Sequence, residues 1–272
     1  MPVMATFYDT HAHLDYPDYA ADLAPVIARA AAAGISRIVA IGTDLESSNR
    51  VLQIAERFPS VYAVVGWHPC HAREAPADLR PALRELARHP KVVAIGEAGL
   101  DYSRWTDGGG QFTPADRAHY QEKQEVIFRQ QLEIAAEFGL SCVVHQRDAL
   151  EDALAQMHAF AGQVRGVFHC FVNDVSALQR VLALGSLVSF TGIVSFKNAQ
   201  NVRDTVAATP LDRLLLETDC PYLAPVPYRG KRCEPAYVKE IAEVVARLKG
   251  CSLDELSQAT CQTAARFFPR LQ

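Results

Sequence analysis

The sequence predicts a (β/α)8 barrel, and two observations lead to this fold class. Eight short apolar runs rich in valine and isoleucine recur along the 272 residues, and segments with helical spacing separate them. The runs are almost continuously apolar, as is typical of parallel strands that are covered on both faces. Strands that alternate with helices in this number fit one barrel domain, residues 1–272.

The predicted elements follow one another in strict order. The strands are expected in the runs TFYDTH, ISRIVAIG, VYAVVGWH, VVAIGEAG, SCVVHQ, VRGVFHCF, LVSFTGIV and RLLLETD. The helices are expected over residues 23–33, 47–58, 77–88, 115–138, 149–160, 175–184, 199–208, 235–249 and 253–268. Ser252 is a candidate N-cap for the last helix. The glycine-rich stretch at residues 106–113 is typical of a loop within the domain.

Composition and charge exclude several classes of protein. Apolar residues make up 49% of the chain and charged residues 21%, which suits a packed core and not a disordered segment. The formal net charge of -4 argues against general coating of nucleic acid, so contacts with a polyanion are expected to be local. Seven cysteines without a C-x-x-C pair favour a reducing cytoplasm. The N-terminus carries no export signal, and no membrane contact is expected.

Six side chains that bind metals well lie at or near the carboxyl ends of predicted strands. A single histidine at a strand end more often makes a structural hydrogen bond, but six such groups on one rim favour a metal site. Four imidazoles and two carboxylates buried together would be unpaired or would repel one another without a cation. The six candidates are His11, His13, Glu97, His145, His169 and Asp219.

Two divalent cations are expected, because six ligands exceed the three that one catalytic zinc with an open position needs. Glu97 is the expected bridge between them, since it comes from a central strand and has two oxygens. One imidazole pair, His11 and His13, would face one cation, and the pair His145 and His169 the other. Zinc, manganese and magnesium all stay candidates, because histidine favours the first two and phosphodiester chemistry often uses the third.

Two carboxylates of the eighth predicted strand have separate expected roles. Asp219 is expected to complete the metal site and to accept a proton from metal-bound water. Glu217 lies two residues earlier on the same side of the strand. Its expected role is either to orient a ligand or to satisfy a buried partner.

Five segments resemble the TatD family of metal-dependent deoxyribonucleases. They are DTHAHLD, VGWHP, IGEAGLDY, VVHQRDAL and LLLETDCPYLAPVPYRGKRCEPAYV, and the match runs from Asp9 to the helix after Pro235. The resemblance implies a barrel of the metal-dependent hydrolase type, two divalent cations and hydrolysis of DNA phosphodiester bonds from the 3′ end. The residues that match the family's metal positions are His11, His13, Glu97, His145, His169 and Asp219.

Two departures from the family pattern lie near the expected rim. After His169 the chain reads HCFVND where HCF is expected to precede Thr-Gly-Ser, so a glycine is missing. Asp174 in this loop is expected to repel a polyanion. The glycine insertion at residues 108–110 is expected to alter how substrate reaches the rim.

Cationic and aromatic side chains near the rim are candidates for substrate contact. His68 follows the third strand and could donate to substrate, while Trp67 and Tyr102 could stack on a base or simply pack beneath a loop. The basic run RGKR could bind phosphate or form a solvated loop. The candidates for phosphate contact are Arg147, Arg229, Lys231 and Arg232. Four histidines are assigned no function: His71, His89, His119 and His158.

Three functions are compatible with these residues. The first is a metal-dependent deoxyribonuclease with DNA as its partner and without an obligate protein partner. The second keeps the barrel and the cations but acts on an ester or amide, such as an aminoacyl-tRNA ester, because two cations polarise carbonyl and phosphoryl oxygens alike. The third is a non-catalytic nucleic-acid-binding protein, which the intact ligand set argues against.

Overall fold

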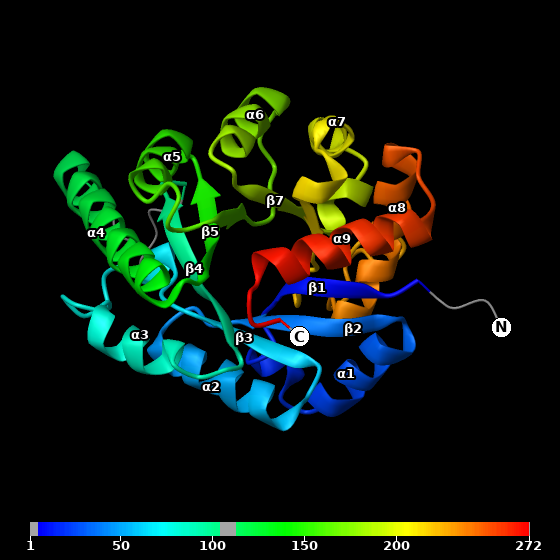
Figure 1. Ribbon diagram of the computed structural model, residues 1–272, viewed down its shortest axis with the longest axis horizontal. Coiled ribbons are helices and arrows are strands. Elements are labelled where there is room, and N and C mark those ends of the chain that lie inside the picture. The colour runs from blue at the N-terminus through cyan, green and yellow to red at the C-terminus, as the bar shows by residue number, and fades with distance from the viewer. Residues whose placement is uncertain (1–4, 104–112, 272) are drawn as a thin grey trace.

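The structure, a computed structural model, describes residues 5–103 and 113–271 and confirms the predicted barrel (Figure 1). Its parallel strands pair in chain order, and helices surround them. The strands are β1 (Phe7–Ala12), β2 (Ile35–Ile41), β3 (Val61–Val65), β4 (Val92–Asp101), β5 (Ser141–Arg147), β6 (Gly166–Phe168), β7 (Leu187–Phe190) and β8 (Leu214–Leu216).

Each predicted helical segment is confirmed in the described part of the chain. The helices are α1 (Leu23–Ala32), α2 (Leu45–Arg57), α3 (Arg80–Ala87), α4 (Pro114–Phe138), α5 (Leu150–Ala159), α6 (Val175–Ala183), α7 (Gln200–Ala208), α8 (Val238–Lys249) and α9 (Leu253–Phe267). Ser252 caps α9 as predicted, because its side chain accepts a hydrogen bond from the Glu255 amide. Within the described ranges, no helix has the length and apolar character needed to cross a membrane.

One strand runs further than predicted, and this changes where Glu97 lies. The run VVAIGEAG was expected to end at Gly99, but β4 continues to Asp101 and resumes its pairing with β5 at Ala98, so Glu97 is not at the strand end. The register shifts between Ile95 and Ala98, which marks a bulge at Glu97. Bulges bend a strand and aim a side chain in a new direction, and they are common beside active sites. Glu97 therefore lies within the barrel wall, almost fully buried.

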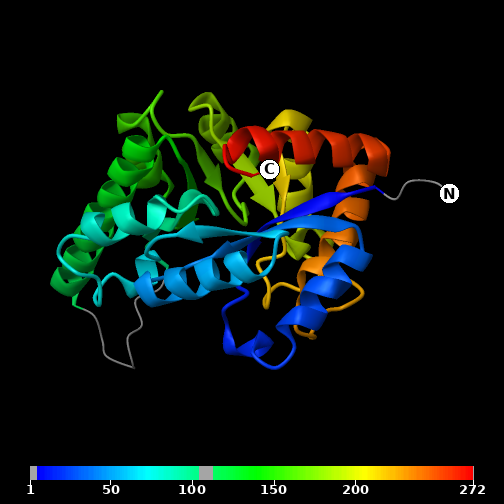
Figure 2. The same cartoon turned by 60° about the horizontal axis from the view of Figure 1, so that its bottom comes forward.

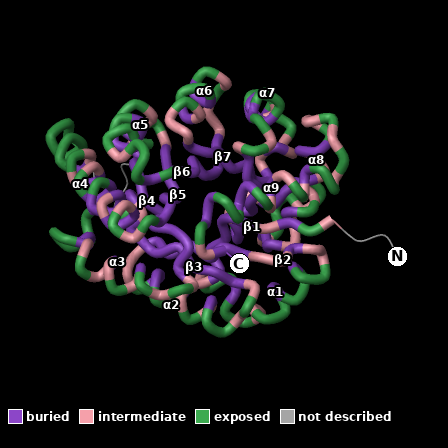
Figure 3. Tube along the Cα trace, viewed as in Figure 1, coloured by how far each residue is buried: buried purple, intermediate pink, exposed green. Residues whose placement is uncertain are grey.

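The strands bury one face inside the barrel and the other beneath the helices (Figure 3). The end of α9 packs against the inward-facing side chains at the start of the strands, and α9 lies along β1 (Figure 2). Side chains therefore fill the amino-terminal end of the barrel, and a ligand can enter only at the carboxyl end. The inward cluster includes Val39, Val64, Val143, Val167, Leu215, Phe267 and Phe268.

The two-residue period of a strand brings site residues from different strands to one axis. Val143 of β5 faces inward, so His145 two residues later does as well. Val167 of β6 faces inward in the same way, and His169 follows it by two residues. The same packing that fills the barrel therefore orients the two imidazoles toward each other.

The barrel closes through a short seam beside the site. Beyond the end of β8, Cys220 forms an isolated parallel bridge with Ala12 of β1. The Asp219 amide donates to the carbonyl of His11 at 2.9 Å, and the His13 amide donates to the carbonyl of Cys220 at 2.9 Å. This seam holds one histidine pair directly against Asp219.

Buried glutamines of α4 hold the loops that follow β3 and β4. The Gln131 amide group accepts from the Trp67 N–H at 2.7 Å and donates to the Trp67 carbonyl at 2.9 Å. Gln124 makes the same double contact with Asp101, at 2.8 Å and 3.1 Å. Each glutamine therefore satisfies two backbone groups that the helix would otherwise bury without partners.

We expect Gln131→Met to lower the free energy of unfolding by about 3 kcal/mol, because it leaves the Trp67 N–H and carbonyl buried without partners. Gln121→Met, at a half-buried position of the same helix, is the matched control and should change stability by less than about 1 kcal/mol. Urea denaturation followed by circular dichroism measures both values. Equal stabilities of the two variants would show that the glutamine contacts contribute little.

Candidate active site

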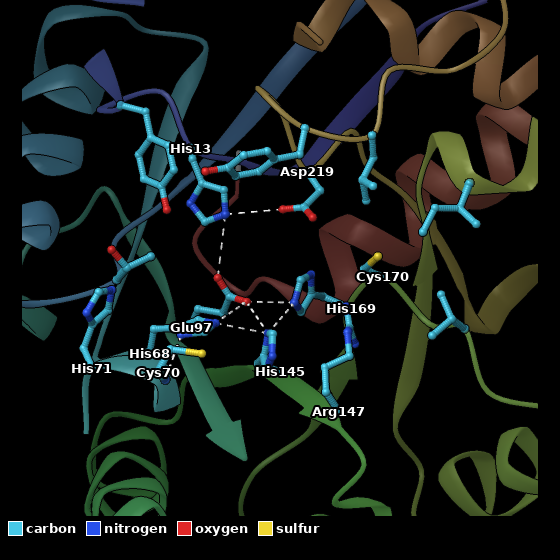
Figure 4. A pocket seen from close by; sticks show the side chains of 16 residues that line it. His13, His68, Cys70, His71, Glu97, His145, Arg147, His169, Cys170 and Asp219 are labelled. Carbon is cyan, nitrogen blue, oxygen red and sulfur yellow. Dashed lines mark hydrogen bonds and ion pairs between the residues drawn. The ribbon is translucent and has the colours of Figure 1, made fainter. Parts of the chain in front are cut away.

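A cavity of about 670 Å³ opens at the carboxyl end of the barrel (Figure 4). The structure brings together all six side chains expected to bind metal at its floor. His11 is fully buried behind the cavity. The other five line it: His13, Glu97, His145, His169 and Asp219.

The first donor group consists of His11 Nε2, His13 Nε2, Asp219 Oδ1 and Glu97 Oε2. The two imidazole nitrogens are 3.4 Å apart. The Asp219 oxygen lies 3.6 Å from His11 Nε2 and 3.3 Å from His13 Nε2. The Glu97 oxygen lies 3.5 Å and 3.7 Å from the same two nitrogens. Four donors from three segments of the barrel rim thus surround one point.

The second donor group consists of His145 Nδ1, His169 Nε2 and Glu97 Oε1. The Glu97 oxygen lies 2.8 Å from each nitrogen, and the two nitrogens are 3.2 Å apart. Figure 4 shows Glu97 between the two sets, with His13 and Asp219 on one side and His145 and His169 on the other. The two oxygens of one carboxylate therefore face different donor groups.

The spacing of the first donor group fits a divalent cation. Donors about 2.1 Å from a central zinc ion in a tetrahedron lie about 3.4 Å from one another, close to the separations in this group. Both His11 Nδ1 and His13 Nδ1 are buried without a hydrogen-bond partner. Neutral imidazoles and carboxylates are the donors that zinc and manganese prefer, so the residues present suit such an ion.

The charges of the site favour a cation as well. Burial alone would raise the pKa of Glu97, but neighbouring imidazoles, chiefly His169 and His68, hold it well below its ordinary value. Burial would also raise the pKa of Asp219, yet its hydrogen bond with His13 keeps it at about 2. Burial would lower the pKa of His169, but Glu97 and Glu217 raise it to about 10. Two ionised carboxylates therefore draw positive charge into the cluster.

Two further carboxylates lie behind the imidazoles. Asp101 Oδ2 lies 3.2 Å from His145 Nε2, on the side of the ring opposite the donor group. Glu217 Oε1 lies 3.6 Å from His169 Nδ1 and accepts a hydrogen bond from the Cys170 amide at 2.7 Å. The Asp101 carboxylate fixes the ring of His145 and its tautomer, so Nδ1 of that ring presents its lone pair to the cavity. Of the two roles considered for Glu217, the hydrogen bond from the Cys170 amide fits the satisfaction of a buried partner, whereas the 3.6 Å separation from His169 Nδ1 is longer than a hydrogen bond.

Sequence reasoning did not identify Asp101. Its partner is 44 residues away in the chain, so no local spacing links them. The available signal was a second carboxylate four residues after Glu97 in the run IGEAGLD, at the position where the strand ends.

Four residues with a left-handed backbone conformation lie at the same end of the barrel. Asp148, Cys170, Asp219 and Leu223 have φ between 44° and 57°, which costs a residue with a side chain about 1 to 3 kcal/mol. Asp219 itself and the residue after His169 are among them. Such strain persists only where surrounding contacts impose it, as the seam and the Glu217 contact do here.

His68 joins the floor of the cavity. Its Nε2 lies 3.2 Å from His145 Nδ1 and 3.4 Å from Glu97 Oε1. Its Nδ1 accepts the Cys70 amide at 3.0 Å, and burial lowers the pKa of the ring to about 4. The neutral ring therefore carries its proton on Nε2 and acts as a donor there. His71, to which we assigned no function, also lines the cavity.

Only one of the four arginine and lysine candidates lies at the cavity. Arg147 lines it, whereas Arg229, Lys231 and Arg232 are not among the lining residues. The Arg232 guanidinium makes two hydrogen bonds of 2.8 Å to Asp22 at the start of α1. The guanidinium carbon of Arg229 lies 3.7 Å from the centre of the Phe196 ring. The RGKR run therefore packs its own loop against the barrel.

Other side chains expected near the rim make structural contacts. Asp174 caps α6, because its side chain accepts the Ala177 amide at 2.9 Å, and it does not line the cavity. Trp67 is only 7% exposed and donates to the His71 carbonyl, so it packs beneath the loop. Tyr102 donates to Glu125 on α4. The insertion at residues 108–110 lies outside the described residues.

Comparison with known proteins identifies the family. The sequence profile of the family described as TatD related DNase matches residues 8–269. The chain belongs to the TatD family. A Bacillus subtilis relative named "uncharacterized metal-dependent hydrolase YabD" is 40% identical to this TatD protein over 96% of the chain and 98% of the relative. An Erwinia tasmaniensis relative named "3'-5' ssDNA/RNA exonuclease TatD" is 34% identical, over 96% and 99%.

A solved structure supports the same assignment. The crystal structure of the TatD homolog YJJV from Escherichia coli matches this TatD fold with a TM-score of 0.87 and 28% identity, over 98% of this chain and 99% of that one. The TatD chain is thus a metal-dependent hydrolase, as predicted. The hypothesis of a non-catalytic nucleic-acid-binding protein is set aside.

We expect Asp101→Asn to weaken the binding of Mn²⁺ or Zn²⁺ about 10- to 100-fold, because the change removes the charge that orients His145. Isothermal titration of the metal-stripped protein measures the dissociation constant. Asp174→Asn makes the same chemical change outside the cavity and should bind metal like the unmodified protein. Equal affinities for the two variants would exclude an orienting role for Asp101.

Proposed function

We propose that this TatD protein is a two-cation phosphodiesterase that removes nucleotides from the 3′ end of single-stranded DNA. The observation that carries the proposal is the position of Glu97, whose two oxygens face two separate donor groups at the floor of one cavity. The exonuclease name of the Erwinia relative supports the choice of a nucleic-acid substrate.

His11, His13 and Asp219 would hold the first cation, and His145 and His169 the second, with Glu97 shared between them. In each group the imidazole nitrogens lie within 3.7 Å of each other and of one Glu97 oxygen. His68 Nε2 also lies 3.4 Å from Glu97 Oε1, but it carries the proton of that ring and so acts as a donor. Two cations are favoured over one because each Glu97 oxygen already faces two imidazole nitrogens of a different pair. The imidazole content favours zinc or manganese over magnesium.

Glu97→Gln keeps the size of the side chain but removes the charge that both cations would share. We expect the number of tightly bound Mn²⁺ or Zn²⁺ ions to fall from two per chain to one or none, because a neutral amide is a weaker ligand. Elemental analysis after dialysis measures the stoichiometry. Asp174→Asn serves as the matched control and should keep two ions. Two ions per chain in both the unmodified protein and the Glu97→Gln variant would rule out a bridging carboxylate.

Bound divalent cations would supply Lewis acidity, which polarises a phosphoryl oxygen and lowers the pKa of water. Asp219 faces the cavity and is ionised at neutral pH, so it can accept the proton of an attacking water. The Arg147 guanidinium lines the same cavity and can neutralise a phosphate oxygen. His68 presents Nε2–H beside Glu97 and can donate to the substrate.

We expect Asp219→Asn to lower kcat for release of 3′ nucleotides about 1000-fold, since an amide cannot accept the proton. The assay follows single-stranded oligonucleotides with Mn²⁺ or Mg²⁺, and a strong chelator should abolish the activity of the unmodified protein. Asp174→Asn should retain full kcat. A variant with more than a tenth of the original kcat, or activity that persists in chelator, would contradict the assignment.

The same site could act on a carboxylic ester, since cations polarise carbonyl oxygens too. A direct comparison of a single-stranded oligonucleotide with an aminoacyl ester distinguishes the two chemistries. Cleavage of the ester alone would overturn the phosphodiesterase proposal while leaving the metal site intact.

A further inference from the structure

The cavity has an ionisable floor and an apolar wall, and only the floor is explained by the proposed hydrolysis. The wall comes from the segments that follow β6, β7 and β8. Its apolar lining residues are Val172, Ile193, Tyr222 and Leu223. An apolar wall beside a floor that would bind phosphate favours a ligand with an apolar part next to its phosphate.

Tyr222 is the unusual member of this wall. Among the described residues three large apolar side chains are about half exposed, and of these Tyr222, at 54%, lines the cavity. An exposed aromatic ring that lines an active-site cavity leaves a large apolar surface in water until a ligand covers it.

The Tyr222 ring is held in place by contacts that lead back to the donor groups. Its amide donates to the Asp219 carbonyl at 3.1 Å. Its ring meets the ring of Tyr16 edge to face, with centroids 6.1 Å apart and an interplanar angle of 80°. Tyr16 in turn stacks on His13 at 4.8 Å and 22°. A ring fixed in this way loses little conformational freedom when a ligand stacks on it.

Other aromatic side chains near the cavity are less available. Trp67 is nearly buried, and one face of Tyr16 is already covered by His13. Of the two tyrosine rings among the described residues that line the cavity, Tyr222 is the exposed one, at 54%.

We propose that Tyr222 forms a nucleobase-binding site, in which its ring stacks on an unpaired base next to the scissile phosphate. The inference rests on the proposed phosphodiesterase function, because a phosphate at the cation-binding floor brings its flanking nucleotide to the apolar wall. Every base has a flat π-face, so stacking accepts any sequence. A base in a duplex is already stacked and paired, so the site selects single-stranded ends.

The test uses oligonucleotides that differ only in one base. One substrate is a single-stranded oligonucleotide, and two others lack the base of the terminal or the penultimate 3′ nucleotide. Removal of the base that stacks on Tyr222 should lower kcat/KM about 10-fold, which corresponds to the loss of one stacked base. We therefore expect the unmodified protein to cleave one of the two abasic substrates about 10-fold less efficiently than the intact substrate.

Variants at position 222 assign that preference to the ring. Tyr222→Ala should lower kcat/KM for the intact oligonucleotide about 10-fold and leave the value for the abasic one unchanged, so the preference disappears. Tyr222→Phe should retain the preference, and Tyr222→Leu should retain only part of it. Val126→Ala removes a side chain that is 48% exposed on α4 and outside the cavity, and it should behave like the unmodified protein.

A binding measurement separates recognition from catalysis. In the Asp219→Asn background, fluorescence anisotropy of a labelled oligonucleotide should show about 10-fold weaker binding when Tyr222→Ala is added, and equal binding for the abasic oligonucleotide. Thermal melting checks that each variant is folded.

The outcomes distinguish the two proposals. If the unmodified protein cleaves oligonucleotides but Tyr222→Ala changes intact and abasic substrates equally, or changes neither, the nucleobase site is wrong and the phosphodiesterase stands. If the unmodified protein cleaves no oligonucleotide with any divalent cation, the proposed function is wrong and the nucleobase site falls with it.

Discussion

The structure depends on a buried carboxylate, Asp9, that closes the barrel. Asp9 Oδ1 accepts the Thr218 amide at 3.0 Å and the His11 amide at 3.2 Å, and Oδ2 accepts the Thr218 hydroxyl at 2.6 Å. These bonds join the first strand to the segment after the last, where regular strand pairing is replaced by a single bridge. Because His11 is one of the joined residues and Asp219 follows Thr218, the contacts that close the barrel also bring the histidine pair of the first donor group to Asp219.

Burying so many ionisable groups at one end of the barrel costs folding free energy. Partners within the site and apolar packing at the opposite end compensate for this cost. A carboxylate or imidazole out of water costs several kcal/mol unless partners surround it, and Glu97 has imidazoles on both sides. The opposite end of the barrel is filled with apolar side chains, and Phe267 and Phe268 at the end of α9 pack there. The close-packed core thus stabilises the fold enough to tolerate the strained backbone at Cys170 and Asp219.

The sequence allowed the strands, the helices and the six clustered side chains to be predicted because these depend on local patterns. Apolar runs place strands, and the two-residue period places His145 and His169 on the inner face. The rest depends on partners far apart in the chain. Arg232 lies 210 residues from Asp22, and Gln131 lies 64 residues from Trp67. A basic run and a helical glutamine look the same in a sequence whether they bind a ligand or a distant backbone.

The distribution of charge limits how this site can hold a polyanion. Of the arginines and lysines in the described residues, only Arg147 lines the cavity, while Glu97 and Asp219 add negative charge at its floor. The Arg147 guanidinium and the His169 imidazole, whose pKa is raised to about 10, offset the charge of these two carboxylates, so the side chains alone offer a phosphodiester little net attraction. Bound cations would add attraction for phosphate, which any small phosphate ester would share. A longer chain gains affinity over such esters only through its other parts, and the apolar wall at Tyr222 is where the cavity offers them contact.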